Sequence, residues 1–583
     1  MYVVATAGHV DHGKSTLVRA LTGMEPDRWA EERRRGMTID LGFAWTTLDS
    51  GAAVAFVDVP GHERFVPNML AGIGPVPAAM IVVAADEGWM PQSAEHLAAL
   101  HALNVRHGLL VVTRCDLADP GPALRAATEQ IAGSTLGTVE AVTVSGRTGA
   151  GLPALRAALR RLTDRLPPPV TGGPVRLWID RSFTIKGAGT VVTGTLGGGV
   201  LTKGDELELV GTRVRIRGLQ TLGSPVDRVE AVARVAVNLR GTDRGAITRG
   251  TALLTPGRFR HTDLIDVRVH GDPATGLPAT IMLHIGSAAV PVAVRPLGPD
   301  TARLRLSRPL PLRIGDRALI RDPGRHHVAG GVTLLDVAPP ALTRRGAAAA
   351  RAEQLAGMDG AADPVAELRR RRLISRAELE SMGVPAGVIT PVAGEWLADP
   401  EHWASLHQRL IDEVRSYAAE QPLEAGAPLE ALRHRLDLPD RALVEALIRP
   451  PLTSRSGRVT TGNPEIPEIL IKAIDRAFDG ADLFAAPEVN RLVELGLGPR
   501  QLAAASRAGL LIRLADTVVL PPEAPARAAE ILAGLPQPFT MSEAKNALRT
   551  TRRVAVPLLE LLDREGLTRR LPDDRRVTTE KQP

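Results

Sequence analysis

A phosphate-binding motif lies within the first twenty residues of the chain. Gly8 and Gly13 let the backbone curl so that successive N–H groups face one centre, and the apolar stretch 2–7 predicts the strand before this P-loop. Lys14 can reach the β- and γ-phosphates of a nucleotide, and the Ser15 hydroxyl can bind Mg²⁺. The predicted nucleotide-binding residues of this motif are Gly8, Asp11, His12, Gly13, Lys14, Ser15 and Thr16.

Two further stretches carry residues suited to a nucleotide-dependent switch. Thr38 follows a charged segment, and a threonine on a mobile loop can ligate Mg²⁺ only while the γ-phosphate is present. Asp58 ends an apolar run and offers a carboxylate to the metal, Gly61 offers an N–H to the γ-phosphate, and His62 could orient water. The predicted metal ligands are Ser15, Thr38 and Asp58, and the predicted catalytic residue is His62. A lone histidine is more often structural, so the prediction depends on the order of the motifs.

The residues after the next apolar runs indicate which base is bound. Asp116 can accept two hydrogen bonds from guanine but none from the matching edge of adenine, which favours GTP and GDP over ATP. After the last run, the backbone N–H groups at Ser145 and Gly146 could meet the guanine O6. The predicted base-binding residues are therefore Thr113, Asp116, Ser145 and Gly146.

The elements that must position these residues form an α/β domain over residues 1–168. Apolar runs at 54–57, 80–85, 109–112 and 139–144 alternate with helix-like stretches, as buried parallel strands do in a doubly wound fold. Ligands gather at the carboxyl ends of such strands. The motifs all lie at these ends, which supports a single nucleotide site.

Two β-barrels are predicted after a Pro-rich linker at 165–169. Short strands separated by Gly-rich turns indicate one barrel over 169–257 and a second over 258–340. Helical patterning returns over 341–583, after a linker at 338–351.

The helical region repeats at a sub-domain period. Leu423, Leu483 and Phe539 occupy similar places at intervals of 60 and 56 residues, and each precedes two helices and a short strand pair. This pattern predicts tandem winged helices, although a generic helical scaffold is the alternative. The predicted modules cover about 364–401, 402–464, 465–522 and 523–583.

The bulk composition limits the class of protein. Lys and Arg total 71 against 65 Asp and Glu, and this net charge of +6 is compatible with a polyanionic partner. The single cysteine, Cys115, excludes an internal disulfide framework and fits a reducing cytosol. With no leader sequence and no long apolar run, we expect a cytoplasmic monomer without membrane association.

The first domain resembles that of the translational GTPases. Gly8–Thr16, Gly36–Ile39 and Asp58–His62 are all on the family's pattern. The guanine motif departs from Asn-Lys-x-Asp because Thr113 and Arg114 occupy its first two positions. Thr113 lacks the amide that braces the P-loop in the family, which suggests faster nucleotide exchange.

The first predicted barrel resembles that of the selenocysteine-specific elongation factors, the SelB family, over Ile179–Thr195. The resemblance implies that the barrel and the switch domain hold the aminoacyl end of a tRNA, here selenocysteyl-tRNA. A selenol is largely anionic at neutral pH, so its pocket should carry positive charge. The predicted pocket residues are Asp180, Arg181 and Arg244, for which a solvated surface arginine is the alternative.

The last predicted winged helix carries three arginine pairs: Arg552 and Arg553, Arg569 and Arg570, and Arg575 and Arg576. The first pair starts the second helix, and the other two lie on the strands of a hairpin. Guanidinium groups suit phosphates and splayed bases, so we predict that these residues bind RNA. The SelB family carries such a module, which implies binding to the hairpin in messenger RNA that recodes a stop codon.

Together these features predict a GTP hydrolase that uses GTP and Mg²⁺ to carry selenocysteyl-tRNA to the ribosome. Another translational GTPase, a GTPase subunit of a metabolic enzyme, and an RNA-binding regulator are the alternatives. Binding of selenocysteyl-tRNA but not seryl-tRNA would separate the first prediction from its rivals.

Overall fold

The computed structural model describes residues 1–26, 38–62, 65–74, 76–185, 189–240, 245, 247–462 and 468–579. It divides into two compact units, Met1–Thr390 and Pro391–Pro583. Among the described residues, no helix is both long enough and apolar enough to cross a membrane.

The N-terminal domain is an α/β fold around a six-stranded sheet. The sheet order is β2-β3-β1-β4-β5-β6, in which β2 runs antiparallel to β3 and the other neighbouring pairs are parallel. The strands are β1 (Tyr2–Ala7), β2 (Gly42–Thr47), β3 (Ala53–Asp58), β4 (Ala78–Ala84), β5 (His107–Thr113) and β6 (Glu140–Thr143). Every residue of β4 is buried, because helices cover both faces of the sheet. The predicted doubly wound α/β domain is confirmed.

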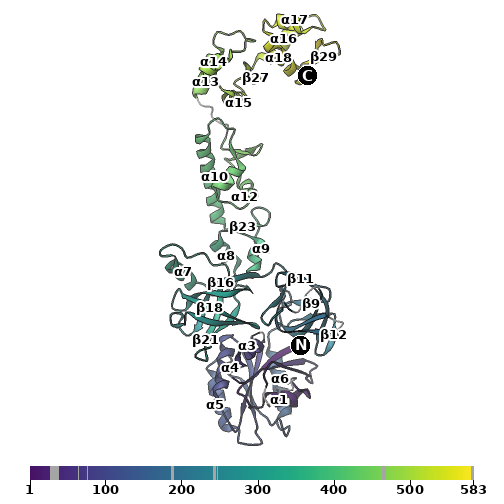
Figure 1. The fold of residues 1–583 in the computed structure, drawn as a ribbon, viewed down its shortest axis with the longest axis vertical. Coiled ribbons are helices and arrows are strands. Elements are labelled where there is room, and N and C mark those ends of the chain that lie inside the picture. Colours follow the sequence, from purple (N-terminus) through teal and green to yellow (C-terminus); the bar gives the residue numbers. More distant parts are fainter. Residues whose placement is uncertain are drawn as a thin grey trace. The chain divides into compact units, whose positions relative to one another are not determined.

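Helices form the two outer layers of this domain, on either side of the sheet (Figure 1). One face packs against α3 (Val66–Ile73), α4 (Pro91–Ala102) and α5 (Gly121–Ala132). The other face packs against α1 (Lys14–Thr22) and α6 (Leu152–Arg165). The P-loop therefore joins the end of β1 to the start of α1, between the two layers.

The first barrel closes through six strands in the order β10-β15-β7-β8-β14-β11, because β10 also pairs with β11. These strands are β7 (Arg176–Ile185), β8 (Gly189–Leu196), β10 (Glu206–Leu209), β11 (Thr212–Thr221), β14 (Ala233–Arg240) and β15 (Ala252–Leu254). The short strands β9 (Val200–Thr202), β12 (Ser224–Val226) and β13 (Arg228–Glu230) lie beside them.

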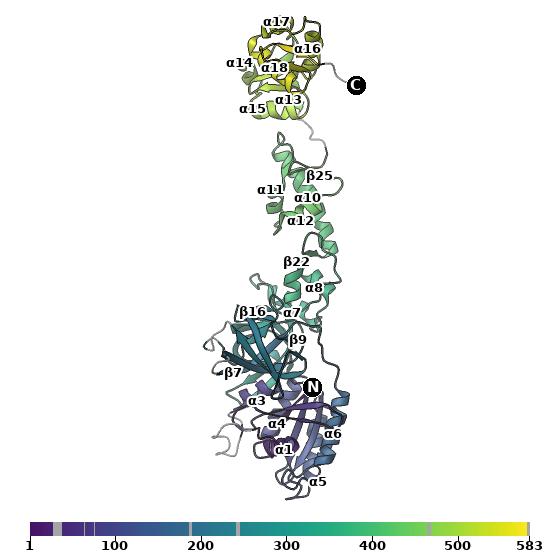
Figure 2. The ribbon, with the colours of Figure 1, turned by 90° about the vertical axis from the view of Figure 1, so that its right-hand side faces the viewer.

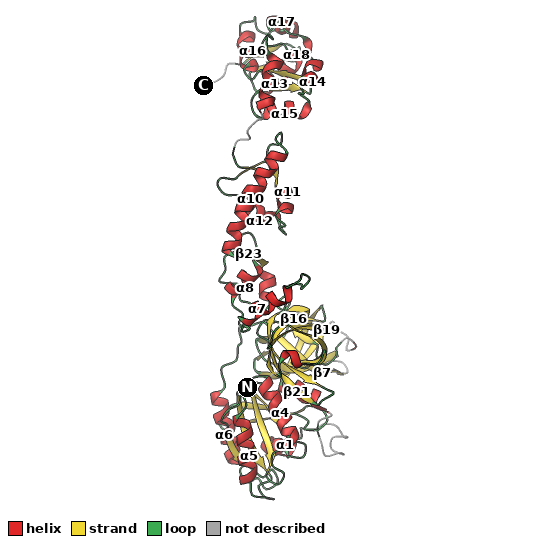
Figure 3. Cartoon of the chain, turned by 90° about the vertical axis from the view of Figure 1, so that its left-hand side faces the viewer, coloured by secondary structure: helices red, strands yellow, loops and turns green. Residues whose placement is uncertain are grey.

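The second barrel is closed in the order β16-β19-β18-β17-β20-β21, and both barrels appear as yellow strands in Figure 3. Its strands are β16 (Arg260–Gly271), β17 (Thr280–Ile285), β18 (Ala288–Pro296), β19 (Thr301–Leu312), β20 (Arg317–Asp322) and β21 (His327–Asp336). The sequence did not predict β21, whose residues after His327 are all buried. Its outer side lies against α4, since a Cβ at Gly331 would come within 2.1 Å of the Ala102 carbonyl oxygen. Burial on both faces removes the alternation that marks a barrel strand.

A short helical segment completes the first unit. It contains α7 (Ala347–Ala356), α8 (Pro364–Arg371), β22 (Leu373–Ser375) and α9 (Arg376–Ser381). Helix α7 begins inside the stretch that the sequence predicted to be a linker. The first predicted winged helix, at 364–401, is divided by the boundary between the units at residue 390.

A buried network of ion pairs fixes this segment to the second barrel. Arg351 donates to Asp266 at 2.7 Å and to Asp336 at 2.5 Å. Arg303 also donates to Asp266, at 2.7 and 2.9 Å, and Arg371 donates to Asp336 at 2.5 Å. The side chains of Asp266, Asp336 and Arg351 are at most 4% exposed. Each carboxylate is thus shared by two arginines.

We expect Asp336→Asn to lower the free energy of unfolding of the first unit by about 3 kcal/mol, because Arg351 and Arg371 would each lose one charged partner in a buried network. Burial alone would raise the pKa of Asp336, but Arg371 and Arg351 outweigh it and lower the pKa. The stabilisation is therefore present above the ordinary aspartate range and lost as the pH falls below it.

Urea unfolding of the full chain at neutral pH tests this prediction. The matched control is Asp263→Asn on the same barrel, where the carboxylate is 51% exposed and 3.5 Å from Arg305. That change should cost less than about 0.5 kcal/mol. An equal loss of unfolding free energy in the two variants would show that the buried network around Asp336 does not stabilise the first unit.

The second unit consists of helical modules, each with a small strand pair. Its first part holds β23 (Trp396–Ala398), α10 (Pro400–Glu420), β24 (Ala427–Pro428), α11 (Leu429–Arg435), α12 (Arg441–Leu447), β25 (Thr453–Arg455) and β26 (Arg458–Thr460). The next part holds α13 (Glu468–Phe478), α14 (Val489–Glu494), α15 (Pro499–Arg507), β27 (Ile512–Ala515) and β28 (Val518–Leu520). The last part holds α16 (Ala524–Ala533), α17 (Met541–Ala547), α18 (Arg552–Arg564), β29 (Thr568–Arg570) and β30 (Arg576–Thr578). The predicted tandem winged-helix architecture is confirmed.

The last two modules lie side by side (Figure 2) and share one hydrophobic core. Phe484, Val518 and Leu520 pack in the same cluster as Leu558 of α18. The Thr550 hydroxyl also donates to the Phe484 carbonyl oxygen, at 2.5 Å. These two modules therefore pack together as one structural unit rather than as two independent domains.

Candidate functional site

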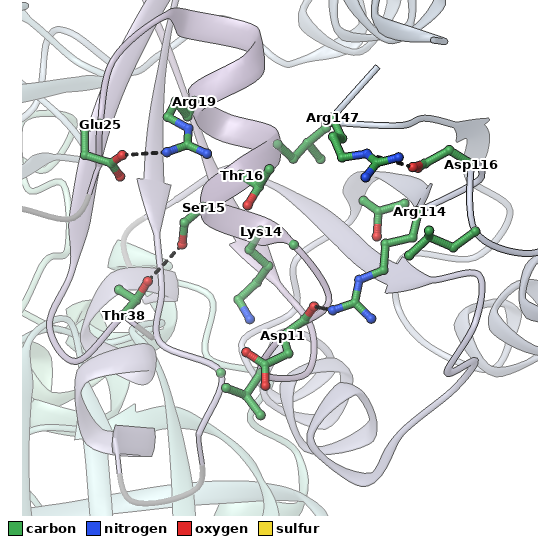
Figure 4. Close-up of a pocket in the computed structure, with 17 residues that line it drawn as sticks. Asp11, Lys14, Ser15, Thr16, Arg19, Glu25, Thr38, Arg114, Asp116 and Arg147 are labelled. Carbon is green, nitrogen blue, oxygen red and sulfur yellow. Dashed lines mark hydrogen bonds and ion pairs between the residues drawn. The ribbon is translucent and has the colours of Figure 1, made fainter. Parts of the chain in front are cut away.

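The cavity at the carboxyl edge of the α/β sheet has a volume of about 660 Å³, which suits a nucleotide (Figure 4). The predicted residues that line it are Asp11, Gly13, Lys14, Ser15, Thr16, Thr38, Gly61, Thr113, Asp116 and Gly146. The sequence did not predict the lining residues Val10, Leu17, Arg19, Glu25, Arg114, Leu117 and Arg147. Gly8, His12, Asp58, His62 and Ser145 are not among the lining residues.

The P-loop is held in a curled conformation at the N-terminus of α1. Gly8 and Gly13 have φ angles of 140° and 78°, and a Cβ at Gly8 would lie 2.2 Å from the Val82 carbonyl oxygen. The Lys14 ammonium donates to the carbonyl oxygens of Gly8, at 3.0 Å, and His9, at 2.6 Å. The N-terminus of α1 and a positive charge therefore meet at the phosphate end of the cavity.

Side chains of α4 fix the P-loop from behind. His96 is buried, and its Nδ1 accepts a hydrogen bond from the Gly8 N–H at 2.9 Å. Gln92 accepts one from the Val10 N–H at 3.0 Å. Burial holds the pKa of His96 well below its ordinary value, so Nδ1 stays an acceptor. His12 is also buried, and burial lowers its pKa to about 4. Gly8 and His12 thus shape the loop, and do so without facing the cavity.

Three oxygen ligands lie together where a magnesium ion is predicted. The Ser15 hydroxyl is 2.7 Å from an Asp58 carboxylate oxygen and 2.9 Å from the Thr38 hydroxyl. Burial raises the pKa of Asp58, and hydrogen bonds from Ser15 and Thr6 oppose this effect. A bound cation would favour the charged carboxylate, and Mg²⁺ takes oxygen ligands. The three residues therefore fit the metal.

Gly61 lines the cavity near Lys14, whereas the next residue, His62, does not line it. A Cβ at Gly61 would come within 2.6 Å of both the Lys14 ammonium and the Val10 nitrogen, so only glycine fits this approach. The ring of His62 lies 6.0 Å from that of Phe65, measured between centroids. This structure does not bring His62 into the cavity.

The guanine motif braces the P-loop in a way that the sequence did not predict. The Thr113 hydroxyl donates to the His12 carbonyl oxygen at 2.7 Å. Arg114 donates to the Asp11 carbonyl oxygen, and to Asp86 and Glu87 at 2.9 and 2.7 Å. Thr113 lacks an amide, but its hydroxyl still braces the P-loop, and the expectation of faster nucleotide exchange stays a prediction.

We expect Thr113→Val to speed GDP release about fivefold, because it removes one hydrogen bond to the P-loop and preserves the shape of the side chain. Stopped-flow fluorescence with a labelled GDP measures the rate. Thr128→Val, on the exposed side of α5, is the control and should leave the rate unchanged. Identical release from both variants would show that the hydroxyl does not brace the loop.

The base end of the cavity holds a charged carboxylate. A hydrogen bond from Ser145 lowers the pKa of Asp116, so the carboxylate remains an acceptor for guanine. Arg147 lies 3.4 Å from the same carboxylate. A Cβ at Gly146 would lie 3.2 Å from the Thr16 methyl group. Asp116, Ser145 and Gly146 are thus brought together, with Ser145 acting through Asp116.

A second charged cluster lies between the α/β domain and the first barrel. Arg234 pairs with Asp180, and its guanidinium carbon is 3.8 Å from the centroid of the Phe43 ring. Arg181 donates to Asp40 at 3.1 Å and lies 5.1 Å from the same ring. Asp180 and Arg181 are therefore close together, whereas Arg244 lies outside the described residues. Arg234 and Phe43 were missed because they are far from Asp180 in the sequence.

The arginines of the last winged helix differ in exposure. Arg552, Arg553, Arg569, Arg570 and Arg575 are exposed. Arg576 is only 4% exposed and donates to Asp563 at 2.8 Å. The prediction that Arg576 faces RNA is therefore wrong: neighbouring strand residues point to opposite faces, and Arg576 points inward.

Comparisons with known proteins agree with this architecture. Residues 1–165 match the elongation factor Tu GTP binding domain, and residues 530–577 match the winged helix of elongation factor SelB. The selenocysteine-specific elongation factor of Escherichia coli (strain K12) is 34% identical over 471 residues, which cover 76% of this chain and 75% of that protein. The chain belongs to the selenocysteine-specific elongation factors. Its first domain is a translational GTPase domain.

Other relatives are matched over less of their length. The selenocysteine-specific elongation factor of Desulfomicrobium baculatum is 39% identical over 337 residues, 55% of this chain and 53% of that protein. The chain thus spans about half of that relative. A crystal structure of bacterial selenocysteine-specific elongation factor EF-Sec has a TM-score of 0.77 at 25% identity and covers 99% of this chain and 100% of that one. Elongation factor SelB from Methanococcus maripaludis, in complex with the GTP analogue GppNHp, shares the fold over 58% of this chain and 79% of that one, at 24% identity and a TM-score of 0.51.

Proposed function

We propose that this protein carries selenocysteyl-tRNA to the ribosome at a recoded stop codon, while its last winged helix holds a hairpin of the messenger RNA. One observation carries the proposal: a single residue, Ile39, separates the switch threonine Thr38 from Asp40 of the charged cluster. Asp40 follows Thr38 closely in the chain and pairs with Arg181 at 3.1 Å and with Arg249 at 2.6 Å. A change at the nucleotide can therefore reach the barrel directly.

In the proposed cycle, the P-loop and Lys14 bind the phosphates of GTP, and Asp116 binds guanine. Ser15, Thr38 and Asp58 would hold Mg²⁺, which when bound neutralises phosphate charge. Thr38 then stays in place, and Asp40 keeps its ion pair with Arg181 on strand β7 of the barrel. His62 would orient the attacking water only after the ribosome moves it toward the cavity.

We infer that the charged cluster is the aminoacyl pocket. Arg181 and Arg234 both lie near the Phe43 ring, which supplies an apolar wall beside two cations. A selenolate is a large, polarizable anion at neutral pH, whereas the serine hydroxyl is neutral, so the two arginines favour selenocysteine. Asp180 holds Arg234 in place and limits the excess charge.

Filter binding with charged tRNAs tests this function. With GTP, we expect retention of selenocysteyl-tRNA but not of seryl-tRNA, and with GDP we expect neither to be retained. Equal retention of the two tRNAs would contradict the proposal and favour a general elongation GTPase. Retention of neither tRNA would favour the GTPase subunit of a metabolic enzyme.

We infer that the exposed arginines Arg552, Arg553, Arg569, Arg570 and Arg575 bind the recoding hairpin. The double variant Arg569→Ala and Arg570→Ala should weaken binding to a hairpin from a selenoprotein message at least about tenfold. Arg527→Ala and Arg564→Ala together, on exposed helix surfaces of the same module, are the charge-matched control. Equal losses in an electrophoretic shift assay would show only a nonspecific charge effect.

Binding of the hairpin raises the local concentration of the bound tRNA at one codon. We propose that the protein works in the cytoplasm as a monomer. Its single cysteine agrees with a reducing compartment.

A further inference from the structure

The turn of the β17–β18 hairpin lies where the second barrel meets both other domains of the first unit. Gly286 and Ser287 form this turn, and Gly286 has a φ of 55°. A Cβ at Gly286 would lie 2.3 Å from the Trp178 ring, and a Cβ at Gly74 would lie 3.0 Å from the Gly286 carbonyl oxygen. The turn therefore contacts the end of helix α3 on one side and strand β7 on the other.

Ser287 fixes the turn to the backbone of β7. Its side chain is buried, and its hydroxyl donates to the Ile179 carbonyl oxygen at 2.6 Å. The same carbonyl accepts a hydrogen bond from the Gly250 N–H at 3.1 Å. Gly250 packs closely on the hairpin, since a Cβ there would lie 2.8 Å from the Ala288 Cα.

Strand β7 has a bulge at the next residue. The register with β8 shifts between Ile179 and Arg181, so Asp180 is the extra residue. A bulge re-aims side chains, and here it directs Asp180 and Arg181 into the charged cluster. The orientation of these two side chains depends on how the bulged backbone is held.

Helix α3 is connected to two successive carbonyl groups of this bulge through other residues. Arg249 donates to the Asp180 carbonyl oxygen at 3.0 Å and also to the Asn68 side chain on α3. The other connection runs from Gly74, after the end of α3, through the hairpin turn to Ile179. Helix α3 begins four residues after His62, so it follows directly on the nucleotide-sensing segment.

We propose that Ser287 is a positioning residue that transmits the position of α3 to the bulge of β7, so that the aminoacyl pocket is formed when GTP is bound. This inference rests on the proposed function and adds the element that would couple the two sites. A packed interface switches between a few distinct arrangements rather than deforming continuously. A small shift of a helix at such an interface can therefore move the element packed against it. The close contact between Gly286 and the Trp178 ring makes that tryptophan a reporter of the turn.

The test uses the full chain with Ser287→Ala, and with Thr262→Val as the control. Thr262 lies on the same barrel, and its hydroxyl donates to the Leu264 carbonyl oxygen of the same strand at 2.9 Å. Two quantities are measured: the ratio of selenocysteyl-tRNA affinities with GTP and with GDP, and the change of Trp178 emission on replacing GDP by GTP. The emission of Trp178 is isolated by subtraction of the spectra of Trp178→Phe.

Ser287→Ala should lower the affinity ratio about fivefold and diminish the Trp178 response, because one buried hydrogen bond is lost, while the affinity for GTP itself is unchanged. A purely structural role would lower both tRNA affinities together and leave their ratio intact, which would overturn the proposal. A ratio and an emission response equal to those of Thr262→Val would also overturn it. If the natural protein shows no GTP-dependent tRNA binding, the proposed function fails, whereas the Trp178 response still tests whether Ser287 couples the turn to the nucleotide.

Discussion

Lys14→Ala is expected to lower the affinity for GTP and GDP at least about 100-fold, since the phosphates would lose a charge-assisted partner in a partly enclosed site. Lys14 is 6% exposed and is the lysine that lines the cavity. Because 65 of the 71 basic residues are arginine, the retention of lysine here indicates that a compact ammonium is needed. Lys14→Arg should therefore also bind poorly, since a planar guanidinium is too large for the curled loop.

Equilibrium titration with a fluorescent GDP measures this effect. Lys203→Ala is the control, because Lys203 is 57% exposed on the first barrel and pairs only weakly with Asp227, at 3.6 Å. The control should bind normally. Binding by Lys14→Ala within threefold of the natural protein would contradict the placement of the phosphates on the P-loop.

His62→Ala is expected to leave the binding of GTP and tRNA intact and to reduce ribosome-stimulated GTP hydrolysis roughly 1000-fold, within the range that a positioned acid or base supplies. His62 does not line the cavity, so its effect should appear only when the ribosome is present. Hydrolysis without ribosomes should change little.

Single-round hydrolysis of labelled GTP on programmed ribosomes tests the role of His62. His261→Ala, an exposed histidine at the start of the second barrel, is the control. Full stimulated turnover by His62→Ala would remove this residue from the mechanism.

The nucleotide site could be predicted from the sequence because its residues lie in short motifs at strand ends. The α/β topology then brings those ends together without further information. Thr113 shows the limit of this reasoning. Its departure from the family pattern suggested a lost brace, but the bond from its hydroxyl to His12 depends on a distance that only the fold sets.

The misassigned arginines share one physical cause. Arg351 and Arg576 were expected in a linker and on an RNA-binding face, but both are buried against carboxylates. The partner of Arg351, Asp266, lies 85 residues away, and Arg234 pairs with Asp180 from a distance of 54 residues. Sequence patterns treat arginine as exposed, because they do not show which distant acid will neutralise it.

The β-barrels were predicted as a class, and their strands only in part. Strands with alternating apolar residues were found, whereas β21 was not, since α4 covers its outer face. The winged helices were recognisable by their period of about 60 residues, but the shared core of the last two modules was not. Contacts between domains leave no periodic signal.

The most direct test of the central claim is peptide formation on ribosomes programmed with a recoded stop codon and its hairpin. With GTP and this protein, selenocysteine from selenocysteyl-tRNA should enter the peptide, and serine from the seryl form of the same tRNA should not. Equal transfer of both residues, or no transfer of selenocysteine by protein that binds GTP normally, would contradict the account.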